Sequence, residues 1–242
     1  MKFAIIAAGE GSRLAAEGIT SPKPLVEVGG ECLIDRLIRI FMDNYAEEIV
    51  VICNDRTALV SSHLVELQRD GLNGRPVPLR FVIKSTPSSM HSFSEISQYL
   101  EDGPFVLTTV DTIFREDEFK NYVDCFRKAL EEGAADGLMG VTDYIDDESP
   151  LHVAVDEGMR ITGFLDNCDQ PRFISGGIYG LNGKAIRVLR LCMENGLSRM
   201  RNFQRALVAV GVRLQAYPFS KVLDIDHASD IVKAEDFLEK GE

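Results

Sequence analysis

The sequence predicts an α/β fold, with a mostly parallel central sheet flanked by helices and a second half of mixed strands. Three observations lead to this fold class. Short apolar runs alternate with amphipathic helical stretches up to about residue 135. After that point, strand-like runs follow one another directly, with only turns between them. The first apolar run ends in a glycine-rich turn, which places backbone N–H groups at the edge where open α/β sheets bind ligands.

Four apolar runs in the first half have the length and composition of buried parallel strands. They are residues 2–6, 48–53, 79–83 and 104–110. Two helices are predicted from apolar residues at three- and four-residue spacing. These residues are Ile34, Leu37, Ile38 and Phe41 in the first helix, and Phe119, Tyr122, Val123, Phe126 and Leu130 in the second. Strands that alternate with helices imply a parallel sheet covered on both faces.

The second half of the chain has more strand-to-strand connections. Its elements are strand-like runs at 137–142, 151–156, 159–165 and 172–181, helices at 183–194 and 199–209, a strand pair at 213–217 and 221–225, and a closing helix at 228–239. The acidic run at 143–149 is most simply a solvated loop. Since neither repeats nor linkers interrupt residues 1–242, we expect a single domain.

Composition excludes several classes of function. The net charge is −12, which disfavours a nucleic-acid partner because phosphate backbones bind basic faces. No apolar run approaches the length of a membrane span, and the short apolar start lacks the form of a signal peptide. The five cysteines show no metal-binding spacing, which fits reduced thiols in a cytoplasmic protein.

Residues 7–25, AAGEGSRLAAEGITSPKPL, contain the strongest signal in the chain. Glycine lets a phosphate approach the backbone closely, so a glycine-rich turn after a strand suits a phosphate ligand. Two general phosphate-binding patterns do not fit. The Walker pattern needs Gly-Lys-Ser/Thr, whereas Gly11 is followed by Ser12 and Arg13. The dinucleotide pattern GxGxxG needs a third glycine where Leu14 stands.

Taken together, these residues resemble the signature of the sugar-phosphate nucleotidyltransferases, A-A-G-x-G-x-R-L followed by a short loop and P-K-P-L. The matching residues are Ala7, Ala8, Gly9, Gly11, Arg13, Leu14, Pro22, Lys23, Pro24 and Leu25. The resemblance is strong in residues 3–25, moderate in 104–114 and 222–238, and weak elsewhere. It implies the nucleotide-diphospho-sugar transferase fold, a Rossmann-like GT-A fold. Its nucleotide-binding half would span about 1–114 and its acceptor-binding half about 115–242.

The resemblance implies that the glycine-rich loop wraps a nucleoside triphosphate. Arg13 would bind the β- and γ-phosphates, and Lys23 the α-phosphate and the charge of the transition state. The prolines beside Lys23 restrict its backbone, so less freedom is lost on binding. The acceptor is itself a phosphate that attacks directly, so no histidine or serine nucleophile is needed. The nucleotide-binding residues implied here are Ala7, Ala8, Gly9, Gly11, Ser12, Arg13 and Lys23.

Displacement of pyrophosphate needs a divalent cation, and the resemblance implies Mg²⁺. Asp111 directly follows the apolar run 104–110 and would be a catalytic metal ligand, although it could instead cap the helix that starts near residue 115. In the family a glycine commonly precedes this aspartate, and Val110 replaces it here.

A second metal ligand is implied in the closing strand–Asp–helix element. Asp226 is the first choice and Asp224 the fallback, although Asp226 could also cap the last helix. His227 and Ala228 stand where the family usually has threonine and proline.

The regions implied to contact the base and the acceptor resemble the family less closely. In the stretch 84–92, Lys84 lies near the family's base-reading glutamine and Ser89 near its glycine, so both are implied in nucleotide binding, with loop polarity as the alternative. The implied acceptor-binding residues are His152, Asp166, Asn167 and Gly177. Asn167 lacks the charge of the family's lysine, and His152 could instead be a partly buried structural histidine.

The resemblance thus predicts a Mg²⁺-dependent nucleotidyltransferase that transfers an NMP from an NTP to a phosphorylated acceptor and releases pyrophosphate. The acceptor would be a sugar 1-phosphate. Three alternatives stay open: a cytidylyltransferase for a phospho-alcohol such as phosphocholine, a nucleotide sensor without turnover, and a glycosyltransferase suggested by D-x-D at 224–226. The expected partners are the nucleotide and the small acceptor, while the base, the acceptor and the oligomeric state are left undetermined.

Overall fold

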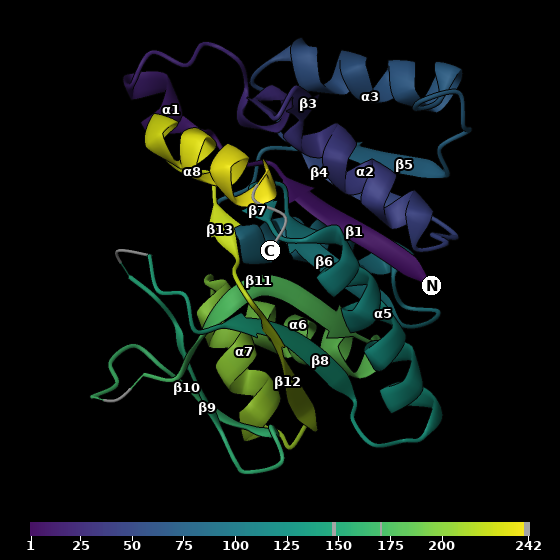
Figure 1. The fold of residues 1–242 in the computed structure, drawn as a ribbon. Helices are drawn as coiled ribbons and strands as arrows, with labels where there is room; N and C mark the ends of the chain where they lie inside the picture. Colours follow the sequence, from purple (N-terminus) through teal and green to yellow (C-terminus); the bar gives the residue numbers. More distant parts are fainter. Residues whose placement is uncertain (147–148, 170, 240–242) are drawn as a thin grey trace.

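The computed structural model describes residues 1–146, 149–169 and 171–239, and within these ranges a nine-stranded sheet forms the centre of the molecule (Figure 1). Its strands are β1 (Lys2–Ala7), β4 (Ile49–Cys53), β5 (Leu79–Ile83), β6 (Phe105–Thr109), β8 (Gly137–Thr142), β9 (His152–Val155), β10 (Ile161–Leu165), β11 (Phe173–Leu181) and β12 (Leu214–Phe219). Their main order is β10-β9-β11-β6-β1-β4-β5, and β8 joins β11 to β12.

The sheet has a parallel part and a mixed part, as the sequence predicts. Strands β6, β1, β4 and β5 run parallel to one another. Strand β11 is antiparallel to β6 and to β8, and β12 is parallel to β8. Each of the four apolar runs in the first half is a strand within one residue of its predicted ends. The fold class predicted from the alternation of strands and helices is confirmed.

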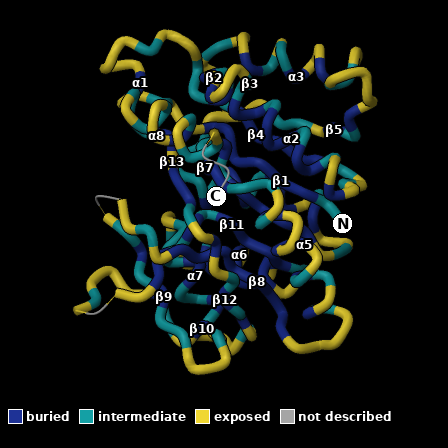
Figure 2. The backbone as a smooth tube through the Cα atoms, in the orientation of Figure 1, coloured by how far each residue is buried: buried dark blue, intermediate teal, exposed yellow. Residues whose placement is uncertain are grey.

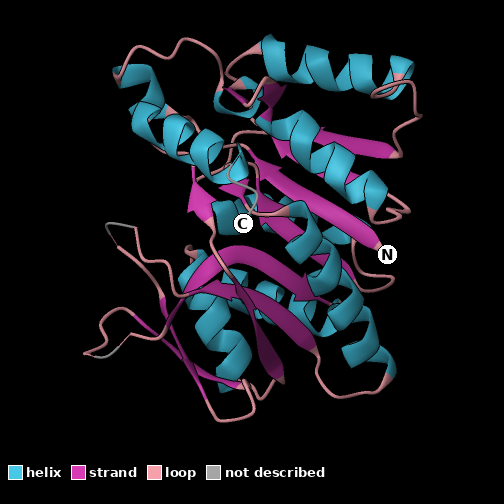
Figure 3. Ribbon diagram, in the orientation of Figure 1, coloured by secondary structure: helices cyan, strands magenta, loops and turns pink. Residues whose placement is uncertain are grey.

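Helices cover both faces of the sheet (Figure 3). They are α1 (Ser12–Ala16), α2 (Leu33–Asp43), α3 (Ala58–Asp70), α4 (Ser89–Ile96), α5 (Glu116–Glu131), α6 (Gly183–Glu194), α7 (Met200–Ala209) and α8 (Ala228–Glu239). Phe3 and Ile5 of β1 join the apolar core under α2, α3 and α5, whereas Ala4 and Ile6 join the core under α4, α6 and α7. This alternation along β1 is the two-residue period of a strand buried on both faces. Figure 2 shows the buried sheet beneath more exposed helices.

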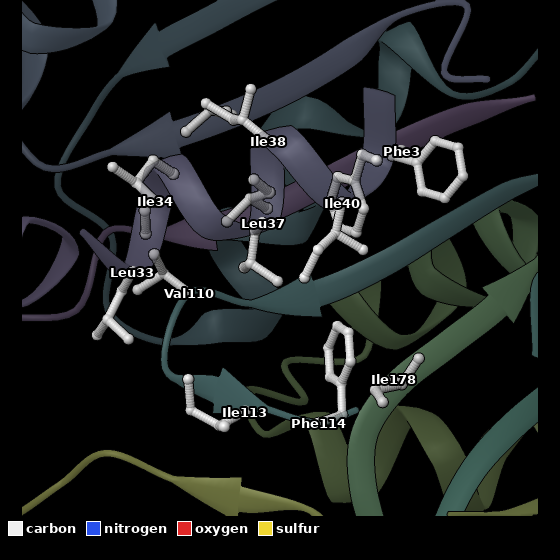
Figure 4. Close-up of a cluster of buried hydrophobic side chains, with 14 of the residues drawn as sticks. Phe3, Leu33, Ile34, Leu37, Ile38, Ile40, Val110, Ile113, Phe114 and Ile178 are labelled. Carbon is white, nitrogen blue, oxygen red and sulfur yellow. The ribbon is translucent and has the colours of Figure 1, made fainter. Parts of the chain in front are cut away.

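Helix α2 anchors the segment that follows β6. Its apolar side packs against β1 and against Val110, Ile113 and Phe114, and Figure 4 shows these side chains meeting. Val110 and Ile113 are 5% and 1% exposed, so the chain is held on both sides of Asp111. The labelled residues of this cluster are Phe3, Leu33, Ile34, Leu37, Ile38, Ile40, Val110, Ile113, Phe114 and Ile178.

The predicted strand pair near the C-terminus is wrong as a pair. Residues 213–217 lie mainly in β12, which pairs with β8, and 221–225 contain β13 (Leu223–Asp224), which pairs with β7 (Thr112–Ile113). The physical reason is burial, since Leu214, Ala216 and Phe219 of β12 join the cores on the two faces of the sheet. The β7–β13 pairing brings the C-terminal segment to the residues that follow Asp111.

Two further differences from the sequence prediction concern helices α4 and α3. The stretch 84–92, predicted as a loop, contains the start of α4, whose N-cap Ser88 accepts a hydrogen bond from the His91 N–H. Helix α3 was not among the helices predicted from spacing, because its buried residues are few: Val60, Leu64 and Leu67.

The acidic run at 143–149 is a loop where it is described, and its residues 147 and 148 lie outside the described ranges.

The turn after β1 depends on one glycine. Gly11 has φ +62° and precedes α1, and a Cβ atom built on it would lie 3.1 Å from the Lys23 Cβ. Lys23 itself begins the short 3-10 helix η1 (Lys23–Leu25), with Pro22 before it and the buried Pro24 after it. The glycine turn and the lysine are therefore packed against each other.

We predict that Gly11→Ala destabilises the protein by about 1–2 kcal/mol, the cost of placing an L-residue in the left-handed region. Its new methyl group would also press on Lys23. Gly9→Ala is the matched control, because a Cβ there meets nothing within 4 Å. Urea unfolding of the two variants checks this, and equal stabilities would contradict it.

A second prediction concerns the contact between α2 and α3. His63 Nε2 lies 2.6 Å from Asp35 Oδ1, and this hydrogen bond raises the pKa of His63 above its usual 6.5, against the opposing effect of burial. A raised pKa in the folded state stabilises the protein below pH 6.5, and the stabilisation is lost as the pH rises through the folded pKa.

We therefore expect wild type to exceed His63→Gln in free energy of unfolding by at most about 1 kcal/mol near pH 5.5, because the pair is partly exposed. The difference should vanish near pH 9. Urea titrations at both pH values measure it, and a difference that does not change with pH would refute the ion pair.

Candidate functional site

A cavity of about 490 Å³ lies at the carboxyl ends of β1 and β6, the edge predicted for ligand binding. It is lined by the glycine turn, by the segment after β6, by the loop before α4 and by single residues from distant parts of the chain. We call it the glycine-turn cavity. Its lining residues are Ile6, Ala8, Gly9, Glu10, Gly11, Ser12, Arg13, Leu14, Lys23, Thr86, Pro87, Ser88, Ser89, Ser92, Thr109, Val110, Asp111 and Asp226.

Four charged groups meet at one side of this cavity. Lys23 Nζ lies 2.5 Å from Asp111 Oδ2 and 2.7 Å from Asp226 Oδ1. The other oxygen of Asp226, Oδ2, accepts a hydrogen bond of 2.8 Å from Arg13 Nη1. The four residues that the sequence singles out for catalysis and metal binding are thus in direct contact, although they are separated by up to 213 positions.

The Lys23 side chain is only 9% exposed, which makes these contacts strong. Burial by itself would lower the pKa of Lys23, but the charges of Asp111 and Asp226 and their hydrogen bonds outweigh it and raise the pKa above its usual value. Burial would likewise raise the pKa of Asp226, and Lys23, with Arg13 and His227, lowers it instead. Lys23 and Asp226 are therefore both charged at neutral pH.

The backbone explains why Asp111 and Asp226 meet. Strands β7 and β13 pair directly beside the two aspartates, and the Ile225 N–H donates to the Asp111 carbonyl at 3.1 Å. Helix α5 begins at Glu116 with Arg115 as its N-cap, so Asp111 does not cap it. At α8, Asp230 accepts the N–H groups of Asp226 and His227, which leaves the Asp226 carboxylate to Lys23 and Arg13.

The two carboxylates fit a divalent cation held together with phosphate oxygens. Asp111 and Asp226 place one oxygen each on the same ammonium nitrogen, so both oxygens face one point in the cavity. Magnesium is commonly bound by one or two carboxylates plus substrate phosphates. No group of three or more possible metal-ligating side chains exists among the residues described. The chemistry of this pair therefore suits a metal that arrives with a phosphate ligand.

Most of the implied nucleotide-binding residues lie at this cavity. Ala8, Gly9, Gly11 and Ser12 line it, and Ala7 is the last residue of β1 just before the turn. Ser89, the first residue of α4, also lines it. Lys84 is not among the lining residues; it is exposed and forms an ion pair of 2.7 Å with Glu95. A role for Lys84 in nucleotide binding stays a prediction.

A second cavity, of about 340 Å³, adjoins the first and shares Arg13 and Asp226 with it. We call it the C-terminal cavity, because β13 and the start of α8 form one wall of it. Its lining residues are Arg13, Thr142, Tyr144, Asp146, Ser149, Ile174, Ser175, Gly176, Val222, Leu223, Asp224, Asp226, His227, Ser229, Asp230 and Lys233. Any molecule bound here would lie beside the ion cluster.

Of the implied acceptor residues, Gly177 is the nearest to the two cavities. It follows Gly176, and a Cβ on it would lie 3.3 Å from the Thr112 hydroxyl. His152, Asp166 and Asn167 are not among the residues lining either cavity. Asp166 forms ion pairs with Arg201 and Arg205, and Asn167 is exposed. His152 is partly buried, and its Nδ1 has no hydrogen-bond partner within the described part of the chain.

Sequence reasoning missed residues that support the site. Asn54 follows β4, and its side chain donates to the carbonyls of Ala8 at 3.4 Å and Gly9 at 3.1 Å, which fixes the glycine turn. Its place directly after a predicted parallel strand was a usable signal. The Thr86 and Ser92 hydroxyls lie 2.6 Å apart beside the cavity, a contact that the sequence does not reveal.

Known proteins that are similar to this chain indicate its family. A family model described as nucleotidyl transferase matches residues 2–241. The glucose-1-phosphate cytidylyltransferase of Salmonella typhimurium is 23% identical over 146 residues, which cover 53% of this chain and 56% of that protein. The chain spans about half the length of the curated relatives it matches.

Two solved structures share the fold. The inositol-1-phosphate CTP transferase from T. maritima has a TM-score of 0.76 at 18% identity, covering 99% of this chain and 96% of that one. The CTP:phosphocholine cytidylyltransferase from Streptococcus pneumoniae has a TM-score of 0.75 at 14% identity, covering 98% of both chains. Together with the family model, which extends over nearly the whole sequence, they confirm the expected fold and family. The chain belongs to the nucleotidyl transferase family.

Proposed function

We propose that this protein is a Mg²⁺-dependent nucleotidyltransferase that transfers an NMP from an NTP to a sugar 1-phosphate, forming an NDP-sugar and pyrophosphate. The observation that carries the proposal is the contact of Lys23 with both Asp111 and Asp226 where the two cavities meet. The glycine-turn cavity would hold the nucleotide and the C-terminal cavity the acceptor. Residues 1–114 would then form most of the nucleotide-binding half and 115–242 the acceptor-binding half.

The reaction needs no protein nucleophile. An oxygen of the acceptor phosphate forms a bond to the α-phosphorus, the bond from that phosphorus to the bridging oxygen breaks, and pyrophosphate leaves with the electron pair. Lys23 would neutralise the α-phosphoryl oxygens, and Arg13 the leaving pyrophosphate. Positioning and charge neutralisation of this kind account for most of the catalysis in phosphoryl-type transfer.

Charge balance supports the dependence on a metal ion. Arg13 and Lys23 are matched by Asp111 and Asp226, so the site has no surplus of positive charge for a triphosphate. A divalent cation bound by the two carboxylates would supply that charge. Lys23 and Arg13 would then be released from the carboxylates and could contact phosphate oxygens.

A second candidate acceptor is a phospho-alcohol with a positively charged group, such as phosphocholine. The C-terminal cavity favours such an acceptor, because four aspartates line the cavity and would attract the positive group. Lys233, which also lines the cavity, is already paired with two of these aspartates, Asp146 and Asp230. A structure with the same fold is named for phosphocholine. The sugar 1-phosphate stays first, because it is the acceptor named in the curated relatives.

Pyrophosphate release tests the proposal directly. CTP, UTP, dTTP and GTP would each be combined with glucose 1-phosphate, mannose 1-phosphate, inositol 1-phosphate and phosphocholine, with Mg²⁺ and with EDTA in its place. We expect release with one sugar 1-phosphate, abolished by EDTA. Release with phosphocholine alone would establish the second candidate. Nucleotide binding without release in any combination would refute catalysis and indicate a sensor.

We predict that Lys23→Ala and Asp111→Asn each lower kcat at least about a hundredfold, because each removes charge that acts on the reacting phosphates. Lys120→Ala is the control, since Lys120 is 63% exposed on α5 and forms an ion pair with Asp124 of the same helix. Steady-state kinetics with the best substrate pair measures the effect. Normal Mg²⁺-dependent turnover by Asp111→Asn would show that the metal assignment is wrong.

No helix in the described part of the chain is long and apolar enough to cross a membrane. The five cysteines are free thiols. A cytoplasmic location stays a prediction from the sequence, and so does the possibility of an oligomer.

A further inference from the structure

A carboxylate outside the ion cluster joins the two ends of the chain. Glu17 is the C-cap of α1, and its Oε1 accepts a hydrogen bond of 2.6 Å from His227 Nδ1. Its Oε2 accepts the Ala228 N–H at 2.7 Å. Both partners follow Asp226 directly in the sequence, so Glu17 holds the segment that presents the second carboxylate of the site. Figure 1 shows α1 and α8 beside each other.

The same short helix makes two bridges to this segment. Arg13, one turn before Glu17 on α1, binds the Asp226 carboxylate at 2.8 Å. Glu17 binds the next two residues through a side-chain and a backbone N–H. On the opposite side, Asp230 accepts the N–H groups of Asp226 and His227. Asp226 is thus oriented from α1 and from α8 together. Helix α1 contributes two side chains to this: the substrate-facing Arg13, which binds the Asp226 carboxylate, and Glu17, which binds the two residues after it.

The contact also satisfies a backbone group that would otherwise lack a partner. The first N–H groups of a helix have no acceptor inside the helix, and Ala228 is the first residue of α8. A carboxylate is a strong acceptor there because it also meets the positive end of the helix dipole. A proline at position 228 could begin the helix equally well, but it would have no N–H to donate to Glu17.

We propose that Glu17 is a positioning residue, which fixes Asp226 relative to Arg13 and so sets the geometry in which the site binds the metal–nucleotide complex. The inference rests on the proposed function of the cluster. Loss of a residue that orients a metal ligand typically costs about 10- to 100-fold in affinity or activity. Since Glu17 lines neither cavity, its effect should come entirely through the segment that it holds.

Three variants separate the two halves of the contact. Glu17→Ala removes both hydrogen bonds. Glu17→Gln keeps an oxygen for the Ala228 N–H and a similar shape, so it should restore much of the function. Ala228→Pro removes only the backbone donor while leaving a residue that is favoured at the first position of a helix.

The matched control is Glu235→Ala. Glu235 lies on the same helix, and its Oε1 accepts the Gly29 N–H at 3.1 Å, so it also docks α8 on the N-terminal half. It lies nine positions beyond Asp226 and lines neither cavity. If docking of α8 were all that mattered, Glu17→Ala and Glu235→Ala would have the same effect.

The test measures binding of the NTP with and without Mg²⁺ by calorimetry, and kcat and KM for both substrates. In Glu17→Ala we expect nucleotide affinity in the presence of Mg²⁺ to fall about tenfold or more, and the Mg²⁺ concentration for half-maximal turnover to rise similarly. The KM for the acceptor should change less. Ala228→Pro should show a smaller loss, Glu17→Gln a partial recovery, and Glu235→Ala wild-type values.

Two outcomes are distinguishable. If wild type turns over but Glu17→Ala matches it, or matches Glu235→Ala in every constant, the positioning role is overturned while the proposed function stands. If wild type neither binds a triphosphate nor releases pyrophosphate, the proposed function fails and this inference fails with it.

Discussion

The ammonium of Lys23 lies between two carboxylates, one from the middle of the chain and one from near its C-terminus, and the arrangement of the site depends on this contact. Buried at 9% exposure, Lys23 would be costly to leave unpaired, and so would two carboxylates facing each other. Each charge is therefore tolerated because the others are present. The cluster holds the glycine turn, the segment after β6 and the start of α8 in one place.

The backbone brings these charges together through a pairing between very short strands. Strand β13 has two residues and pairs with β7, which also has two, yet this contact places Asp226 beside Asp111. Its stability comes from the neighbours, since Ile113 and Leu223 of the paired strands are both buried in the core. The apolar residues on either side of Asp111 therefore serve the site by fixing the backbone from which the carboxylate projects.

The sequence predicted the parts of the fold that are encoded locally. Buried parallel strands are apolar runs, and the glycine-rich signature is contiguous, so β1, β4, β5, β6 and the turn could be recognised without a structure. The partner of β13 could not, because a two-residue strand has no periodicity and its pairing is decided by tertiary burial. The same limit applies to Glu17, whose role is visible only when His227 and Ala228 are seen beside it.

The residues implied to bind the acceptor were the hardest to predict, and the cavity proposed to hold the acceptor shows why. Besides Arg13, the C-terminal cavity is lined by three segments, within 142–149, 174–176 and 222–233. Most of their lining residues lie in loops or near the ends of strands and helices. Alignment to a family pattern directed attention to His152 and Asn167, which lie on or beside the outer strands β9 and β10. Loops at the edge of a sheet vary in length and charge while the strands below them persist. In the proposed function, the choice of acceptor would then depend on the charges that these loops bring to the cavity, where aspartates predominate.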